Sequence, residues 1–275
     1  MAELRFTLGL SRRFSVRDQG GFTTIALLCF VMLYAPMVTL VIYSFNDGNS
    51  IAVWEGFSWR WYDMAIHNRQ IQDATVRSLQ VAAFATVVST VVATMAALAT
   101  TRTAPFRGMT AAYALINQPL MVPEIVTAVA LLVFFAMIKA ATGYTGMGYL
   151  FAAHTAFCIP FAYMPIRARL EDMSLTLEQA AADLYATPWR VFRYVTLPLL
   201  MPGVLAGAML AFVISLDDVV ITLFVAGPGQ DTLPLYMIGQ LRRIVTPEMN
   251  AVSSLFLLVS VLLVTLFFFL SRRKR

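Results

Sequence analysis

Long apolar stretches alternate with short polar segments along the whole chain of 275 residues. A helix needs roughly 20 mostly apolar residues to cross about 30 Å of hydrocarbon. Six stretches meet that requirement, and we predict transmembrane helices at residues 21–44, 75–100, 109–138, 149–166, 198–226 and 247–270. The predicted fold class is therefore an all-α integral membrane protein, with a cytoplasmic segment at 1–20 and a basic cytoplasmic tail at 271–275.

The first apolar stretch follows an arginine-bearing start, as the apolar part of a signal peptide would. However, residues 21–44 exceed the roughly 7–15 residues of such a region, and no small-x-small cleavage site follows them. We therefore expect a retained first helix.

Composition supports a membrane protein and excludes an ordinary soluble domain. Hydrophobic residues make up 59% of the chain and charged residues 13%, against about 45–50% and about 25% in soluble domains. The net charge of +5 does not indicate nucleic-acid binding, because in a membrane protein the location of basic residues matters more than their sum. Cys29 and Cys158 both lie in apolar stretches, which predicts two buried, unreactive thiols and no disulfide.

The distribution of basic residues predicts the orientation, because Lys and Arg accumulate in cytoplasmic segments. With a cytoplasmic N-terminus, the inside segments carry Arg5, Arg12, Arg13, Arg17, Arg102, Arg107, Arg167, Arg169, Arg190, Arg193, Arg272, Arg273, Lys274 and Arg275. The outside segments carry Arg60, Arg69, Arg77, Lys139, Arg242 and Arg243. This bias predicts that both termini are cytoplasmic in a bacterial inner membrane.

The outer segment 45–74 is rich in aromatic residues, among them Trp54, Trp59, Trp61 and Tyr62. Such residues suit a short helix at the membrane surface. A loop packed on its own protein is an equally good interpretation.

The long inside loop, residues 167–197, has the pattern of two short helices. Thr176 and Gln179 form a capping-box pattern that predicts a helix start at Leu177. Thr187 and Pro188 predict a second start, with proline at the first helical position. The local pattern fits a docking surface and a solvated hairpin without a partner equally well.

The same loop resembles the EAA loop of ABC importer permeases. That loop has the pattern E-A-A, three residues, G, nine residues, I-x-L-P, and its spacing matches Gln179-Ala180-Ala181, Tyr185 and the segment 195–198. Gln179 replaces the glutamate, with Glu178 next to it, and Tyr185 replaces the glycine. If the family glycine adopts a left-handed turn, a tyrosine there is strained or the turn is remodelled.

The resemblance extends to segments 33–46, 119–135, 215–229 and 232–252 and is to the spermidine/putrescine permeases, most of all the second membrane subunit of the putrescine type. It implies the type I ABC importer fold, a polyamine substrate, and a complex with a homologous permease, two ATPase subunits and a periplasmic binding protein. It also implies that loop 177–197 couples this chain to the ATPase. The implied coupling residues are Glu178, Gln179, Ala180, Ala181, Asp183, Tyr185, Ala186 and Arg190.

Motifs for enzymatic work are missing from the sequence. Neither Lys139 nor Lys274 can complete the phosphate-binding motif G-x-x-x-x-G-K-[ST], and His67 and His154 lack the surroundings of a metalloprotease or serine hydrolase site. We therefore expect no enzyme, metal or cofactor on this chain, with ATP and Mg²⁺ held by the partner ATPase subunits. The alternatives are a related permease for another small amine or amino-acid-like solute, and a self-sufficient secondary transporter, which should show inverted repeats.

Three carboxylates lie within the predicted helices: Glu124, Asp217 and Asp218. Ionised groups there are costly and face a partner or a watery cavity, so we predict an anionic path for a dication. Pairing with Arg77, Arg242 or Arg243, or with the sister permease, is the alternative.

Neighbouring residues refine this prediction. Pro119 and Pro123 predict an interruption of the third helix just before Glu124. Asp217 and Asp218 are about 100° apart on a helix, which suggests that one faces the path and the other a neighbouring helix. Ser215 and Thr222 are weaker path candidates, and His154 is expected to be hydrogen-bonded inside the bundle.

Overall fold

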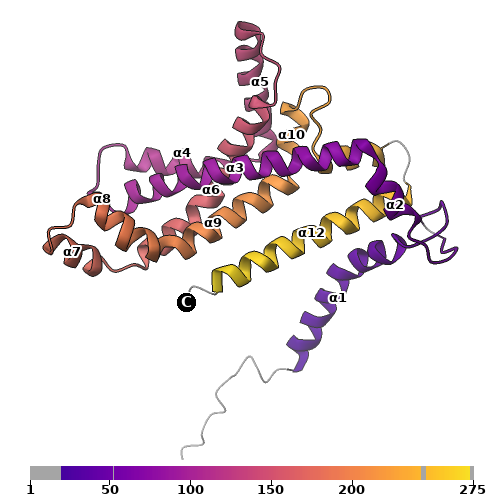
Figure 1. The fold of residues 1–275 in the computed structure, drawn as a ribbon, viewed down its shortest axis with the longest axis horizontal. Helices are drawn as coiled ribbons and strands as arrows, with labels where there is room; N and C mark the ends of the chain where they lie inside the picture. The colour runs from indigo at the N-terminus through magenta and orange to yellow at the C-terminus, as the bar shows by residue number, and fades with distance from the viewer. Residues whose placement is uncertain (1–19, 52, 243–245, 273–275) are drawn as a thin grey trace, which may run out of the picture.

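The computed structural model describes residues 20–51, 53–242 and 246–272, and these form a helical protein (Figure 1). Outside the helices, the described residues include an isolated antiparallel bridge between Asn46 and Phe57. The elements are α1 (Gly20–Tyr43), α2 (Arg60–His67), α3 (Arg69–Thr101), α4 (Met109–Met121), α5 (Glu124–Thr142), α6 (Gly148–Glu171), α7 (Thr176–Asp183), α8 (Pro188–Val191), the π-helical turn η2 (Phe192–Thr196), α9 (Leu197–Asp217), α10 (Val220–Val225), α11 (Leu233–Leu241) and α12 (Pro247–Arg272).

Among the described residues, six helical stretches are long and apolar enough to cross a membrane. They are Gly21–Tyr43, Arg69–Thr101, Glu124–Thr142, Gly148–Glu171, Pro188–Asp217 and Pro247–Phe269. The predicted fold class, an all-α protein with six spans, is confirmed. The helices of the second and fourth spans, α3 and α6, extend several residues beyond the predicted ranges 75–100 and 149–166.

The third predicted span, 109–138, is not one helix. It breaks between α4 and α5, where Val122 is extended (φ −97°, ψ 137°) and Pro123 precedes α5. Proline lacks an N–H and disfavours helical geometry in the residue before it, so the interruption predicted before Glu124 is confirmed. The α4 segment lies along the bundle, whereas α5 projects away from it (Figure 1).

The prediction of one continuous fifth helix over 198–226 is wrong. The α9 helix ends at Asp217, Asp218 is extended (φ −64°, ψ 133°), and α10 begins at Val220. The Asp218 carboxylate accepts the backbone N–H groups of Ile221 and Thr222 at 3.1 and 3.0 Å. Satisfying the free N–H groups of a new helix start is what an aspartate cap does, so Asp218 favours the break.

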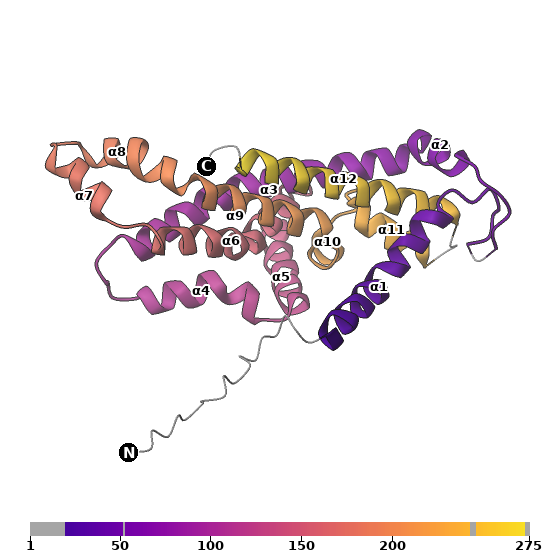
Figure 2. The same cartoon turned by 90° about the horizontal axis from the view of Figure 1, so that it is seen from below.

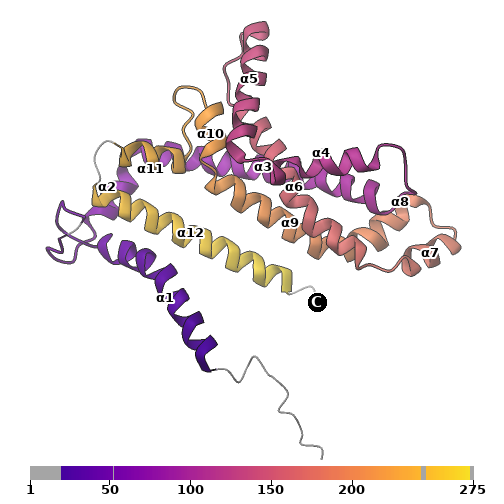
Figure 3. The same cartoon turned by 180° about the vertical axis from the view of Figure 1, so that it is seen from behind.

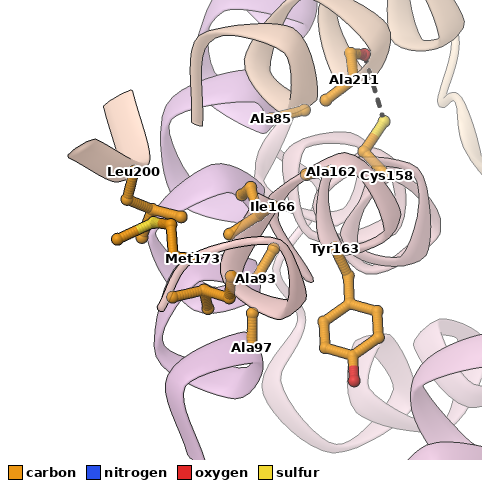
Figure 4. Close-up of a cluster of buried hydrophobic side chains, with 11 residues drawn as sticks. Ala85, Ala93, Ala97, Cys158, Ala162, Tyr163, Ile166, Met173, Leu200 and Ala211 are labelled. Atoms are coloured by element: carbon orange, nitrogen blue, oxygen red, sulfur yellow. Dashed lines mark hydrogen bonds between the residues drawn. The ribbon is translucent and has the colours of Figure 1, made fainter. Parts of the chain in front are cut away.

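The core is formed by α3, α6 and α9, which pack on one another along the long axis of the molecule. Small residues predominate at their contacts, as Figure 4 shows for Ala85, Ala93, Ala162 and Ala211. The larger Tyr163 points toward α3, where its hydroxyl bonds that of Thr100 at 2.8 Å. Close helix approach through small side chains is typical of membrane bundles.

Two glycines one helical turn apart bring α9 onto α6. A β-carbon at Gly203 would lie 2.5 Å from Cβ of Arg169, and one at Gly207 would lie 2.6 Å from the carbonyl oxygen of Ala162. Residues 203–207 thus form a small-xxx-small contact.

The two ends of the bundle carry different elements. The α7 and α8 helices lie at one end of the long axis, together with the loop that joins α3 to α4, and α2 and α11 lie at the other (Figures 1 and 2). If the long axis crosses the membrane, the loops that hold α7 and α2 lie on opposite sides, as the sequence predicts.

The first helix is peripheral. It meets α12 near the α2 end and diverges from it toward the other end (Figure 3), and its apolar side chains are mostly exposed. Cys29 on α1 is therefore exposed, whereas Cys158 in the core is buried. The prediction of two buried thiols holds for Cys158 and is wrong for Cys29, because a helix at the edge of the bundle buries almost none of its surface.

The segment before α2 folds on itself around Asn46. The Asn46 side chain donates to the carbonyls of Ser50 and Val53 and accepts the N–H of Glu55. The sequence allowed two interpretations of the aromatic residues here, as a surface for the membrane or as packing on the protein itself, and the structure shows residues of both kinds. Trp61 is 5% exposed, whereas Trp54 and Trp59 are 45% and 61% exposed.

Candidate functional site

The first candidate site is the loop that holds α7, α8 and η2, residues 176–196, which we call the elbow. Its first helix begins at Thr176 rather than Leu177, and the predicted capping box is not formed. Instead, the Ser174 hydroxyl accepts the N–H of Thr176 at 3.2 Å. The second start agrees with the sequence pattern, with Thr187 extended and Pro188 at the first helical position.

Tyr185 ends α7 in a left-handed conformation, with φ of 60°. Its N–H donates to the Ala182 carbonyl at 2.9 Å, and the N–H of Ala186 donates to the Ala181 carbonyl at 3.2 Å. These two bonds are the Schellman motif, whose left-handed position is usually glycine. Among the described residues, Tyr185 is the one non-glycine residue with positive φ. The turn expected for a family glycine is thus retained with a bulky residue.

The outer face of the elbow carries exposed apolar side chains. Leu177, Leu184, Tyr185 and Trp189 are 55%, 82%, 96% and 64% exposed. The other expected coupling residues differ in exposure: Gln179, Ala180, Asp183 and Arg190 are exposed, while Ala181 and Ala186 are half-buried. Exposed apolar patches of this kind mark interaction sites.

Glu178 points the other way, into the bundle. Its Oε2 lies 3.3 Å from Nε of Arg102, and its Oε1 accepts the Thr196 hydroxyl at 2.8 Å. Nη2 of Arg102 also donates to the Met173 carbonyl at 3.1 Å. The sequence did not predict the roles of Arg102 and Thr196. Arg102 was recognised only as one of the basic residues of the cytoplasmic segments. A cavity of about 340 Å³ lies beside this cluster, lined by Leu98, Arg102, Glu178, Ala182, Ala186, Pro188, Val191, Phe192 and Thr196.

The second candidate site lies where both interrupted helices break. Glu124, at the first turn of α5, lies close enough to Asp218, just before α10, for the two carboxyl groups to interact. Asp217 also lies within electrostatic reach of Asp218. The structure therefore brings together all three carboxylates that the sequence selected.

A buried polar network surrounds Asp218. His154 on α6 bonds the Ser215 hydroxyl through Nδ1 at 2.9 Å and the Thr222 hydroxyl through Nε2 at 3.0 Å. Its Nε2 also lies 3.4 Å from the Asp218 carboxylate, and both side chains are 1% exposed. The Thr222 hydroxyl donates to Asp218 at 3.0 Å. This network gives the carboxylate local partners at the helix break.

Asp217 lies in different surroundings. It lines a cavity of about 640 Å³ whose walls come from α1, α3, α9, α11 and α12 and are mostly apolar. Thr86 contributes a further polar side chain to these walls. The two adjacent aspartates thus face different environments, one a cavity and the other a neighbouring helix.

Of the arginines offered as alternative partners, Arg77 bonds elsewhere. Nε of Arg77 donates to the Asp231 carbonyl at 2.9 Å. Arg243 lies outside the described residues. No ion pair between an arginine and Glu124, Asp217 or Asp218 is present in the part of the chain that the structure describes.

Residues 89–273 match the family described as the binding-protein-dependent transport system inner membrane component. The chain belongs to this family. The permease is 41% identical over 236 residues to the putrescine transport system permease protein PotI of Escherichia coli (strain K12), which covers 85% of this chain and 84% of that protein. It is 36% identical over 244 residues to the spermidine/putrescine transport system permease protein PotC of Haemophilus influenzae, which covers 89% and 93% of the two chains.

Solved structures show that the permease fold is shared more widely. A bacterial ABC transporter that imports the acidic polysaccharide alginate matches with a TM-score of 0.68 and 15% identity, over 96% of this chain and 99% of that one. The MetNI methionine ABC transporter matches with a TM-score of 0.61 and 18% identity, over 74% and 94%. At such identities the likeness concerns the fold alone, and it agrees with the ABC permease fold that the EAA-like loop implied.

Proposed function

We propose that this permease carries a polyamine, with putrescine as the first candidate, through an ATP-driven importer of the bacterial inner membrane. The observation that carries the proposal is the 41% identity to a putrescine permease over most of both chains. Other small amines and amino-acid-like solutes are the competing substrates within the same family.

In this proposal, ATP is hydrolysed by partner subunits. The sequence has no complete phosphate-binding motif, since its two lysines follow Ile138 and Arg273. The elbow offers an exposed apolar face for docking, and the full assembly would contain a second permease, two ATPase subunits and a periplasmic binding protein. With the elbow in the cytoplasm, both termini are cytoplasmic and α2 and α11 face the binding protein.

The proposed substrate path includes Glu124 and Asp217. A polyamine that leaves bulk water must keep its charges stabilised, because an isolated ion in a low-dielectric region costs several kcal/mol even after relaxation. Asp217 lines a large cavity and Glu124 is only half-buried, so both remain accessible. Asp218, with Ser215 and Thr222, lies in the buried network and positions the helix break beside the path.

The decisive experiment is uptake by the reconstituted complex with radiolabelled putrescine, spermidine and 4-aminobutyrate. We expect ATP-dependent accumulation of putrescine above the other two, lost when the binding protein is omitted. Preference for 4-aminobutyrate would show that the substrate is an amino-acid-like solute and not a polyamine. Uptake by liposomes that hold this chain without ATPase subunits would instead favour a secondary transporter.

A further inference from the structure

The first helix of the elbow, α7, contacts the bundle through a small polar cluster rather than through a packed interface, whereas η2 runs directly into α9. None of the residues of α7 is buried, and its closest packing is with α8 and η2, which belong to the elbow itself. Glu178 is the member of α7 whose side chain reaches α3, through Arg102, and it also bonds Thr196, the last residue of η2 before α9.

We propose that Arg102, Glu178 and Thr196 form a latch that transmits displacement of the elbow to α3 and α9. The three are positioning residues and do not touch the substrate. The proposal rests on the function proposed above, in which the elbow docks on an ATPase subunit.

The latch joins four parts of the chain through the side chains of Glu178 and Arg102. One Glu178 oxygen holds Arg102 at the end of α3, and the other holds Thr196 at the start of α9. Arg102 in turn holds the Met173 carbonyl, just after α6. A movement of α7 therefore pulls on the cytoplasmic ends proposed for all three core helices.

These contacts are better shielded from water than an ordinary surface pair. The Arg102 and Glu178 side chains are only 15% and 16% exposed, and Thr196 is 5% exposed. Exposed pairs contribute little because water screens them and their side chains are free to move. The Arg102–Glu178 pair is largely removed from solvent, and its side chains have less room to move. Thr196 ends a π-helical turn, a geometry that often occurs at functional positions.

The cavity beside the latch also supports a role of the latch in transmitting movement. Close-packed interiors transmit strain through direct contact. Beneath the elbow, however, about 340 Å³ is open between Leu98 on α3 and the apolar side chains of Val191 and Phe192. Because packing is incomplete there, displacement of α7 reaches α3 through the Arg102–Glu178 pair.

The test compares Glu178→Gln, Arg102→Glu, Glu178→Arg and the double variant Arg102→Glu/Glu178→Arg in the full transporter. The matched control is Glu171→Gln, which weakens the exposed pair of Glu171 with Arg167 near the same end. The readouts are ATPase co-purification, basal ATP hydrolysis, binding-protein-stimulated ATP hydrolysis and putrescine transported per ATP.

We expect each single variant to keep its ATPase subunits and basal hydrolysis, but to transport about fivefold less putrescine per ATP, the factor expected of a pair at the upper end of the exposed range. The double variant should recover part of this loss, and Glu171→Gln should behave as wild type.

Unchanged coupling in the single variants would overturn the latch, and so would loss of ATPase co-purification, which would mean that the cluster only shapes the docking surface. Failure of the proposed function is seen separately, as a wild-type complex that does not move putrescine. In that case the binding-protein stimulation of ATP hydrolysis still tests the latch.

Discussion

Gly207 of α9 lies so close to Ala162 of α6 that a β-carbon on the glycine would sit 2.6 Å from the alanine carbonyl oxygen. We predict that Gly207→Ala destabilises the permease by about 1–3 kcal/mol, the usual cost of overpacking. Thermal unfolding in detergent measures this. Gly239→Ala in α11, where nothing lies within 4 Å of the added carbon, is the control and should not destabilise. Equal unfolding temperatures for the two variants would contradict the close contact.

The left-handed turn at Tyr185 gives a second prediction. An L-residue other than glycine costs roughly 1–2 kcal/mol in this conformation, so Tyr185→Gly should stabilise the end of α7 by about that amount and leave transport intact. Amide exchange of the Tyr185 and Ala186 N–H groups, which close the motif, measures the change. Leu184→Gly, at a neighbouring exposed position with φ of −81°, should bring no such gain. A loss of protection in Tyr185→Gly would contradict the prediction.

The alanines of the elbow provide a test of docking. An arginine at exposed Ala180 or half-buried Ala181 adds bulk and charge to the elbow, which we propose docks on an ATPase subunit. We expect Ala180→Arg and Ala181→Arg to lower ATPase co-purification and transport at least about tenfold, which corresponds to about 1.4 kcal/mol of binding free energy. The membrane domain should keep its unfolding temperature. Normal co-purification in both variants would contradict docking through this part of the elbow.

The carboxylates at the helix breaks should differ in function. Glu124→Gln and Asp217→Asn remove charge from the proposed path and should lower putrescine transport several-fold while basal ATP hydrolysis persists. Asp218→Asn should mainly lower stability, by about 1–3 kcal/mol, because a buried network loses its full set of partners. Uptake and unfolding temperature, measured on the same preparations, separate these effects. If all three variants transport normally, the anionic path is wrong.

Orientation can be tested with reporter fusions. We expect fusions after residues 60 and 235 to report a periplasmic location, and fusions after 105 and 185 and at the C-terminus to report a cytoplasmic one. The bias of basic residues motivates this expectation. A periplasmic signal at 185 would remove the coupling role of the elbow.

Local signals in the sequence were sufficient for the fold class and for several details. Apolar length predicted the spans, Pro123 predicted the break before α5, and Thr187 with Pro188 predicted the start of α8. The carboxylates at 124, 217 and 218 were selected together, and the structure places them together. In each case the signal lies within a few residues of the feature that it predicts.

The features that were missed depend on residues far apart in the chain. Arg102 and Glu178 meet only because α3 and the elbow end at the same place, so neither residue alone predicts the pair. The break at Asp218 depends on a cap whose surroundings include His154, on another helix. Hydrophobicity alone suggested a buried thiol at Cys29, but it does not distinguish a core helix from one at the edge.

The break between α9 and α10 has a consequence for how the protein opens locally. A helix as short as Val220–Val225 is not stable by itself, and α10 packs mainly on α5, where Ile221 and Ala128 belong to one buried cluster. We therefore expect the two segments to open together, and more readily than α3, α6 and α9. When they open, they uncover the Asp218 network without requiring the core helices to separate, so the centre of the molecule can fluctuate while its frame stays folded.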